Sequence, residues 1–463
     1  YRTRFRVGNR DVLGTDFKWV REDRIAEDRL PDDLAVLTRR EWGPMYGRVA
    51  ALYRGDQVIA EGPEAWSALG LYLDQTHRLY ERIRDLEEHR IGDINYHMER
   101  LRLDRQALRL DDVLTTDETA RDRELGASLV RLESEYQEAA KELEALYQRA
   151  HEHALAVRLS NGQTVHVPLA QILRVMRPNE MAWWNKSLMY LANLWEFVSG
   201  EPRESNTEGG IFPAIFGTVL MVFLMTIVVT PFGVLAAVYL REYAKQGPLV
   251  KLVRIAVNNL AGVPSIVFGV FGLAFFVYAV GGTIDALWYP EALPNPTYGT
   301  GGILWASVTL ALLTVPVVIV ATEEGLSSVP RDFREGSVAL GATKFETIWK
   351  VVLPYAMPGI LTGLILAMAR AAGEVAPLML VGVVKLAPAL PLDGFFPFLH
   401  LDRKFMHLGF HIYDVGFQSP NVEAAKPMVY MTTLTLIVVV VSLNLVAVMI
   451  RNRLRKRHAG SAV

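Results

Sequence analysis

The sequence contains no cysteine, and this absence excludes disulfides, thiol catalysis and cysteine-ligated metal centres. It also has no excess of positive charge, because 48 Lys and Arg residues stand against 50 Asp and Glu residues. A chain that binds nucleic acid usually carries a basic face, so we expect no nucleic acid among its partners. No Walker loop, dinucleotide fingerprint or nucleophile triad is recognisable in the sequence. We therefore expect no bound cofactor and no catalysis by this chain itself.

Two parts of different character follow each other along the chain. Hydrophobic residues make up 51% of the sequence and charged residues 21%, which suits neither a soluble protein nor a pure membrane bundle. Residues 1–205 are dense in Arg, Glu and Asp, whereas the remainder contains long uncharged runs. We predict two domains, 1–205 and 206–463, of which the second is a polytopic membrane helix bundle in a mostly α-helical protein.

Several uncharged runs are long enough to cross a membrane, which takes about 20 apolar residues. They are residues 211–240, 255–284, 301–321, 351–384 and 427–450, and the fourth is interrupted only by Arg370 and Glu374. Lys and Arg between spans favour the cytoplasmic side, and they are frequent in 241–254, 322–350 and the C-terminal tail. We predict an inner-membrane protein with a cytoplasmic C-terminus, a periplasmic domain 1–205 and one further span before that domain.

The segment between the third and fourth spans, "VPRDFREGSVALGATKFETIWKVVLP", predicts two short helices around a glycine. The first begins after Pro330 and ends at Gly341, where a left-handed cap is favourable. The second begins at Thr343, with Glu346 at the spacing of a capping box. From composition alone, an ordinary charged connection between two spans is an equally good interpretation.

This segment resembles the coupling loop of ABC importer permeases, in which Glu-Ala-Ala is followed by a glycine and later by Ile-x-Leu-Pro. Here Glu335 precedes Gly341 by six residues, and Leu353-Pro354 follows at the expected distance, although Gly336-Ser337 replaces the two alanines. The stretches "GGIFPAIFGT", "NNLAGVPSIVFGVFGLAFF", "ARAAGE" and "APLMLVG" are similar to the PstA family of phosphate ABC importer permeases. The resemblance extends from about residue 209 to the C-terminus.

The resemblance implies a type I ABC importer permease fold and a set of partners. These are a second, PstC-like permease subunit, a PstB-like ATPase dimer, a periplasmic PstS-like phosphate-binding protein, phosphate and the lipid bilayer. Energy would come from the ATPase, which would contact the coupling loop about residues 322–350. The residues implied in that contact are Glu335, Ala339, Leu340, Gly341, Ala342 and Thr343.

Arg370 and Glu374 are two charges within an apolar run, where a charge costs roughly 3 kcal/mol on insertion scales. We expect Arg370 near the middle of the membrane and Glu374 on the same helical face. The planar guanidinium suits phosphate oxygens, and the nearby carboxylate would keep binding weak enough for release. The resemblance implies the same translocation role for the pair. The alternative is a structural ion pair between spans.

The N-terminal part is interpreted from its residues alone. Residues 50–62 and 156–169 predict β-hairpins, and residues 64–110 and 117–153 predict two long helices with apolar seams. We predict an antiparallel coiled-coil arm of about 64–153, which would serve as a spacer or as a docking arm. A helix at about 180–198 with Trp183, Trp184 and Trp195 is typical of a membrane interface.

Two other functions stay open from the sequence. A membrane-anchored envelope scaffold or sensor would use the arm as its working part, but it would need neither a coupling loop nor the charged pair. A permease for sulfate, molybdate or another oxyanion would differ only in the chemistry of its substrate site. His400, His407 and His411 are a weak alternative metal-site signal, and we predict no metal there.

Overall fold

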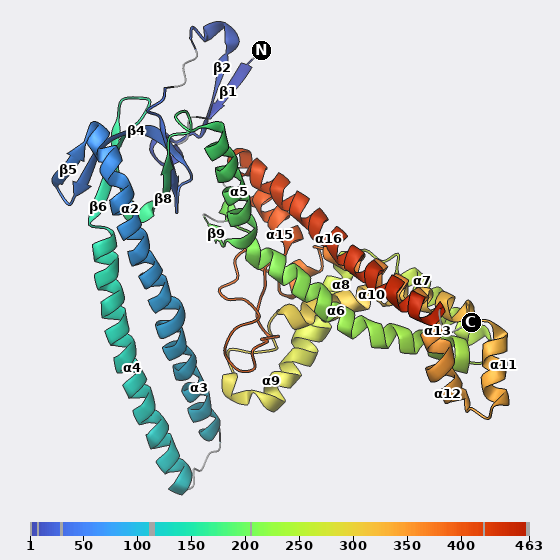
Figure 1. The fold of residues 1–463 in the computed structure, drawn as a ribbon. Coiled ribbons are helices and arrows are strands. Elements are labelled where there is room, and N and C mark those ends of the chain that lie inside the picture. Colours follow the sequence, from blue (N-terminus) through green and yellow to red (C-terminus); the bar gives the residue numbers. More distant parts are fainter. Residues whose placement is uncertain are drawn as a thin grey trace. The chain divides into compact units, whose positions relative to one another are not determined.

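The computed structural model describes residues 2–6, 9–27, 31–110, 116–203, 206–419 and 422–459 (Figure 1). The chain divides into two compact units. The first contains residues 1–196 and the short segment Pro290–Ala292, and the second contains 197–289 and 293–463. The division at 196/197 lies close to the predicted domain boundary, although residues 204 and 205 lie outside the described residues.

An antiparallel sheet forms the base of the first unit. Its strands follow the order β7-β6-β4-β3-β8, with β5 paired to β4. Both predicted hairpins are present, as β4–β5 and β6–β7, and Gly162 takes the positive φ of 85° that the second turn requires. The strands are β3 (Ala35–Arg39), β4 (Met45–Arg54), β5 (Gln57–Glu61), β6 (His153–Arg158), β7 (Thr164–Pro168) and β8 (Ile172–Met176). A separate pair, β1 (Arg2–Arg6) and β2 (Phe17–Arg21), was not predicted.

Two long helical segments extend from this sheet and pack against each other, which we call the arm (Figure 1). One is α2 (Gly62–Asp85), the π-helical turn η2 (Leu86–Ile91) and α3 (Gly92–Leu108), and the other is α4 (Thr116–Ala150). Leu86, Ile94 and Ala139 are among the buried residues that join them. The apolar seam changes register near Gly92 because the wider π turn adds residues there.

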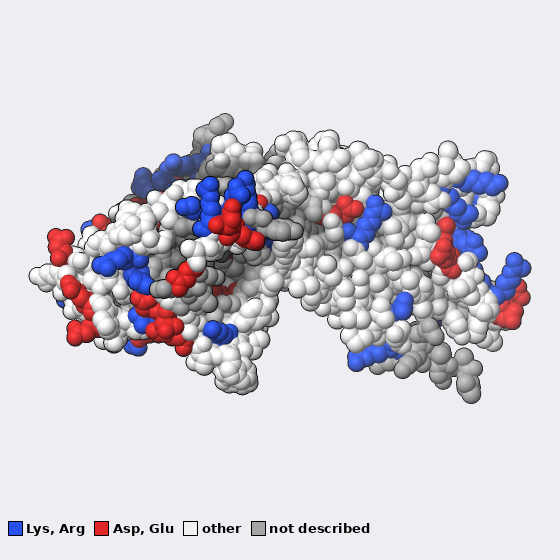
Figure 2. Space-filling view, turned by 90° about the horizontal axis from the view of Figure 1, so that it is seen from above, with Lys and Arg blue, Asp and Glu red and all other residues white. Residues whose placement is uncertain are grey.

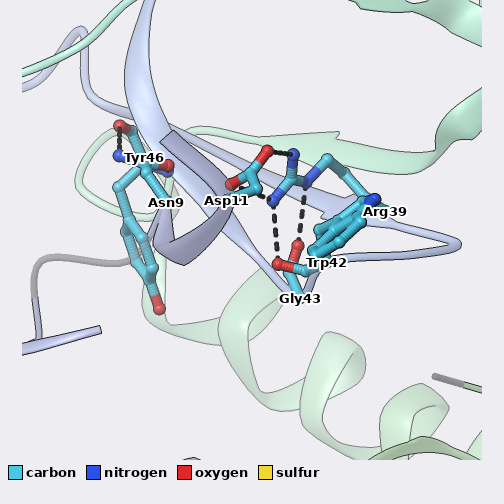
Figure 3. Close-up of polar contacts among 6 residues, drawn as sticks. All are labelled: Asn9, Asp11, Arg39, Trp42, Gly43 and Tyr46. Atoms are coloured by element: carbon cyan, nitrogen blue, oxygen red, sulfur yellow. Dashed lines mark hydrogen bonds and ion pairs between the residues drawn. The ribbon is translucent and has the colours of Figure 1, made fainter. Parts of the chain in front are cut away.

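Arg39 anchors the N-terminal segment of the first unit to the sheet (Figure 3). Its buried guanidinium donates to both oxygens of Asp11, at 2.7 and 3.1 Å, and to the carbonyls of Trp42 and Gly43, both at 2.9 Å. Asp11 lies on the short helix α1 (Arg10–Leu13). The ion pair therefore holds α1 and the 42–43 turn against the end of β3.

Asp11→Ala should destabilise the first unit by about 3 kcal/mol, because the change leaves a buried arginine without its counter-charge. Hydrogen exchange of the β3 and β4 amides in the intact protein measures the loss as faster exchange. The matched control is Asp33→Ala, which removes an exposed partner of Arg48 and should cost less than about 1 kcal/mol. Equal exchange rates in the two variants would contradict this account.

In the described part of the second unit, five helical segments are long and apolar enough to span a membrane, as predicted. They are Phe212–Tyr243, Ser265–Trp288, Ile303–Ser327, Lys344–Gly373 and Val422–Arg453. Their principal helices are α6 (Phe212–Val238), α8 (Ser265–Phe271) with η6 (Gly272–Gly281) and α9 (Gly282–Trp288), α10 (Ile303–Ser327), α13 (Leu353–Gly373) and α16 (Val422–Ala459).

Two predicted span boundaries were wrong. The second span was expected from residue 255, but a separate helix, α7 (Pro248–Leu260), precedes it. The chain breaks at Gly262 to Pro264, because proline lacks an N–H and disfavours helix before it. The fourth span was expected to reach residue 384, but α13 ends at Gly373. The sequence stays apolar beyond Gly373, so its composition did not show where the fourth span ends.

The buried helix α10 forms the core of the second unit, in contact with α6 and α13. Small residues bring the helices together: a Cβ on Gly359 would lie 2.7 Å from the Cα of Gly325. The first N–H groups of α10 donate to carbonyls of the 401–403 segment, from Ile303 to Arg403 at 2.9 Å and from Leu304 to Leu401 at 3.0 Å. Charged side chains gather at the end of this unit that carries α11 (Arg331–Ala339) and α12 (Lys344–Thr347) (Figure 2).

Candidate substrate path and coupling surface

Arg370 lies in the last turn of α13, where a cation interacts favourably with the carbonyl end of the helix. Glu374 follows Gly373 with extended backbone angles (φ −82°, ψ 128°), and its N–H donates to the carbonyl of Ala371. Pro377 follows shortly after the end of the helix, where it has no N–H to continue the helical hydrogen bonds. A new short helix, α14 (Leu378–Val381), begins immediately afterwards.

The two charges form a loose pair. Nε of Arg370 lies 3.6 Å from Oε1 of Glu374, and the side chains are 32% and 22% exposed. Among the described residues, nothing forms a hydrogen bond with the Arg370 guanidinium, so its N–H donors are available to a ligand. The pair lowers the cost of burying either charge while leaving the cation accessible.

One part of the expectation for this pair was wrong. Sequence reasoning placed Glu374 on the same helical face as Arg370, while the mid-membrane position expected for Arg370 stays a prediction. The structure puts Arg370 three residues before the end of the Lys344–Gly373 span and Glu374 beyond the helix. Uncharged residues on both sides had suggested one continuous helix, whereas the signal for its end was the Ala376-Pro377 step.

The break that follows Glu374 is closely packed. A Cβ on Gly269 of α8 would lie 2.7 Å from the Cα of Pro377, so the two segments touch by their backbones. On the other side, a Cβ on Gly409 would lie 2.5 Å from Cγ2 of Val375. Gly409 belongs to α15 (Leu408–Tyr413). The backbone next to Glu374 is therefore held between α8 and α15.

The second candidate site is the pair of short helices between α10 and α13. Both predicted helices are present: α11 begins after Pro330, and Thr343 and Glu346 form the predicted capping box before α12. Gly341 has the left-handed φ of 87° between them. Of the predicted coupling residues, Glu335, Ala339, Gly341 and Thr343 are exposed, and Ala342 is half-buried.

Leu340 is the most exposed large apolar residue of this surface, at 91%. Phe345 and Trp349 lie nearby in sequence with their rings stacked at 6.1 Å, and both are exposed. Large exposed apolar side chains such as these are typical of a protein interface. We call residues Leu340, Phe345 and Trp349, together with the exposed acid Glu335, the coupling surface.

Sequence reasoning missed the contacts that fix this surface to the bundle. Arg334 donates to Oε1 of Glu242 at 2.6 Å and to the carbonyl of Leu326 at 2.7 Å, and Lys344 donates to the carbonyl of Glu242. Glu242 lies in η5 (Tyr239–Tyr243), the π-helical end of the first span. No local spacing could have revealed a pair that is 92 residues apart in sequence.

A polar pocket of about 330 Å³ lies close to the same end of the bundle. Arg254 of α7 pairs across it with Glu323 of α10 at 3.1 Å. Its other polar lining residues are Arg241, Asn258, Glu324 and Ser327. Lining cations and acids are balanced, so the pocket has no strong preference for an anion.

Two buried histidines lie between the fourth and fifth spans. Nδ1 of His407 accepts from the N–H of Gly409 at 3.1 Å, while its Nε2 and both ring nitrogens of His411 have no partner among the described residues. Burial lowers the pKa of each histidine to about 4. The described residues contain no cluster of three or more His, Cys, Asp or Glu suited to a metal ion.

The sequence matches, over residues 229–456, the family described as binding-protein-dependent transport system inner membrane component. It is 35% identical over 243 residues to phosphate transport system permease protein PstA 1 of Mycobacterium tuberculosis (strain CDC 1551 / Oshkosh), which covers 52% of this chain and 71% of that protein. The chain belongs to this permease family. Similarity to PstA of Mycobacterium leprae is 32% identity over 302 residues, covering 64% of this chain and 86% of that protein.

A solved structure of the methionine ABC transporter MetNI in an inward-facing conformation is also similar, with 20% identity and a TM-score of 0.38. The match covers 56% of this chain and 97% of that chain. Within this permease, the family match begins in α6 and ends in α16. It includes Arg370, Glu374 and the coupling surface, whereas the sheet and the arm lie outside it.

Acid should destabilise the second unit through His407 and His411. Each binds a proton below pH 6.5 when unfolded but only near pH 4 when folded. Their contribution to stability is therefore complete above pH 6.5 and is lost as the pH falls toward 4, by roughly 3 kcal/mol for each histidine. The charged groups that act on His411 are Asp414, which raises its pKa, and Lys385, which lowers it.

His411→Leu should reduce the fall in unfolding temperature between pH 7.5 and pH 5, measured on purified protein in detergent. His97→Gln changes an exposed histidine of the arm and should leave the wild-type fall intact. If His411→Leu lost as much stability in acid as the wild type, the buried histidine would not be the source.

Proposed function

We propose that this permease is one membrane subunit of an ATP-driven importer of inorganic phosphate, with Arg370 and Glu374 on the substrate path. The observation that carries the proposal is the accessible Arg370 guanidinium, held by a loose contact to Glu374 where an apolar helix breaks. Relatives named as phosphate transport permeases support phosphate as the substrate. Arginine suits this anion because its planar donors bind two phosphate oxygens at once.

Glu374 would allow the path to release the anion after binding it. A transport site must attract its ion and must also release it. The 3.6 Å contact between Arg370 and Glu374 is loose, so phosphate that approaches Arg370 displaces the Glu374 carboxylate. The displaced carboxylate then repels the phosphate. Competition between the anion and Glu374 keeps binding weak.

The coupling surface would receive the motion of a separate ATPase. Leu340 and the stacked Phe345 and Trp349 would enter an apolar groove, and Glu335 would meet a basic group at its rim. The Arg334–Glu242 and Lys344–Glu242 contacts would transmit the movement to the first span. The assembly would contain a PstC-like second permease, a PstB-like ATPase dimer and a PstS-like phosphate-binding protein.

The proposed contact with an ATPase implies a membrane orientation. ATP is cytoplasmic, so α11 and α12 would face the cytoplasm, as would the basic C-terminal end of α16. Residues 1–205 would then form a periplasmic α+β domain with the arm of about 64–153. Trp183, Trp184 and Trp195 are exposed on helix α5 (Trp183–Ser199). This helix would lie at the periplasmic surface of the inner membrane, between lipid and water.

Arg370→Gln should lower phosphate uptake at least about tenfold, since one charge-assisted contact is lost. Uptake of radiolabelled phosphate is measured in cells whose only high-affinity system contains this chain, with ATPase association as the assembly control. Arg370→Lys should retain part of the activity, because it keeps the charge without the planar fork.

Glu374→Gln should lower both KM and maximal rate, since phosphate would bind more tightly and leave more slowly. Normal uptake by Arg370→Gln would remove this pair from the path.

Leu340→Asp should abolish co-purification with the ATPase and stop uptake, because it places a charge in an apolar groove. Glu335→Lys should uncouple transport while the chain still inserts into the membrane. Val130→Asp is the matched control, an equivalent change at an exposed position on α4. Retained ATPase binding in Leu340→Asp would show that the coupling surface lies elsewhere.

A further inference from the structure

A second paired charge lies further along the same connection between the fourth and fifth spans. Nζ of Lys385 is 3.2 Å from Oδ2 of Asp414. The two partners differ in burial, because the Lys385 side chain is 40% exposed and that of Asp414 only 2%. An anion arriving from solvent therefore meets the ammonium group, with the carboxylate behind it.

The backbone around Lys385 is fixed in place. Val384 donates to the carbonyl of Phe405 at 3.0 Å, and Nδ2 of Asn206 donates to the carbonyl of Lys385 at 2.7 Å. The same Asn206 amide lies 3.5 Å from Oδ2 of Asp414. Asn206 is itself buried and has the unusual positive φ of 70°. These contacts fix the backbone of Lys385 and the position of the Asp414 carboxylate. The ammonium group of Lys385 can therefore move only over a small region.

Helix α15 connects this pair to the first one. Gly409 packs against Val375, the residue after Glu374, while Asp414 follows the helix and holds Lys385. Asp414 lies five positions after Gly409, which is about 8 Å along a helix. The two ion pairs therefore belong to one packed region of the second unit.

Both pairs share one feature: a partly exposed cation, 32% for Arg370 and 40% for Lys385, lies beside a more buried carboxylate. We propose that Lys385 is a second cationic station of the anion path, which receives the oxyanion before Arg370. This inference rests on the proposed function. Asp414 plays for Lys385 the part that Glu374 plays for Arg370: it lowers the cost of the charge when no anion is bound and limits the affinity when one is. A flexible ammonium suits a site of first capture, because it makes no demand on the orientation of the anion.

Lys385→Gln should raise the KM for phosphate uptake about tenfold with little change in maximal rate, because one charge-assisted contact at the entry is lost. Lys385→Arg should restore most of the affinity. Lys426→Gln is the matched control: Lys426 pairs with Glu423 at 2.7 Å, but both side chains are about half exposed. Its KM should equal that of the wild type.

The double variant Lys385→Gln/Asp414→Asn separates a path role from a structural one. Lys385→Gln alone leaves Asp414 buried without its cation, and the second change removes that penalty. A KM that stays high in the double variant supports the station. A KM that returns to the wild-type value, or one that is unchanged in Lys385→Gln, overturns it. Failure of the proposed function would be visible separately, as absent phosphate uptake in the wild type or normal uptake in Arg370→Gln.

Discussion

Backbone groups that lie away from water need partners within the protein, and this requirement determines where the spans of the second unit begin and end. The first N–H groups of α10 donate to carbonyls of the 401–403 segment. Before α6, Ile211 and Phe212 donate to the carbonyls of Phe197 and Gly200. The connections between spans are therefore tied to helix ends instead of hanging freely, and the charges that they carry are held in fixed positions.

Three of the charged pairs in the second unit share one arrangement. In the pairs Arg370–Glu374, Lys385–Asp414 and Arg334–Glu242, the acid is more buried than the base. Pairing compensates for the desolvation of each carboxylate, while each cation keeps part of its surface available. Two of these pairs lie beyond the end of α13 or in its last turn, and the third lies at the coupling end of the bundle. The same physical arrangement thus occurs both at the proposed anion path and next to the coupling surface.

Local signals in the sequence predicted the helices well and the tertiary contacts poorly. The capping box at Thr343 and Glu346 needs only a spacing of three residues, and long apolar runs needed only counting. By contrast, Lys385 and Asp414 are joined by the packing of α15, which no local pattern encodes. The end of α13 was missed because hydropathy continued through Pro377 and hydropathy does not register a lost hydrogen bond. Strands β3 and β8 were missed because each is short and the two pair with each other although they lie far apart in the sequence.

The contact between Gly325 and Gly359 has a mechanical consequence. These glycines bring α10 and α13 into backbone contact at the end from which α11 and α12 extend, so no side chain is available there to act as a soft spacer. A force applied to α11 and α12 must then displace α10 and α13 together, as one rigid unit. The opposite end of this helix pair, away from α11 and α12, carries the first turn of α10 and the last turn of α13. The 401–403 segment caps the first turn of α10. A push at one end is therefore delivered at the other as a common displacement of these two turns.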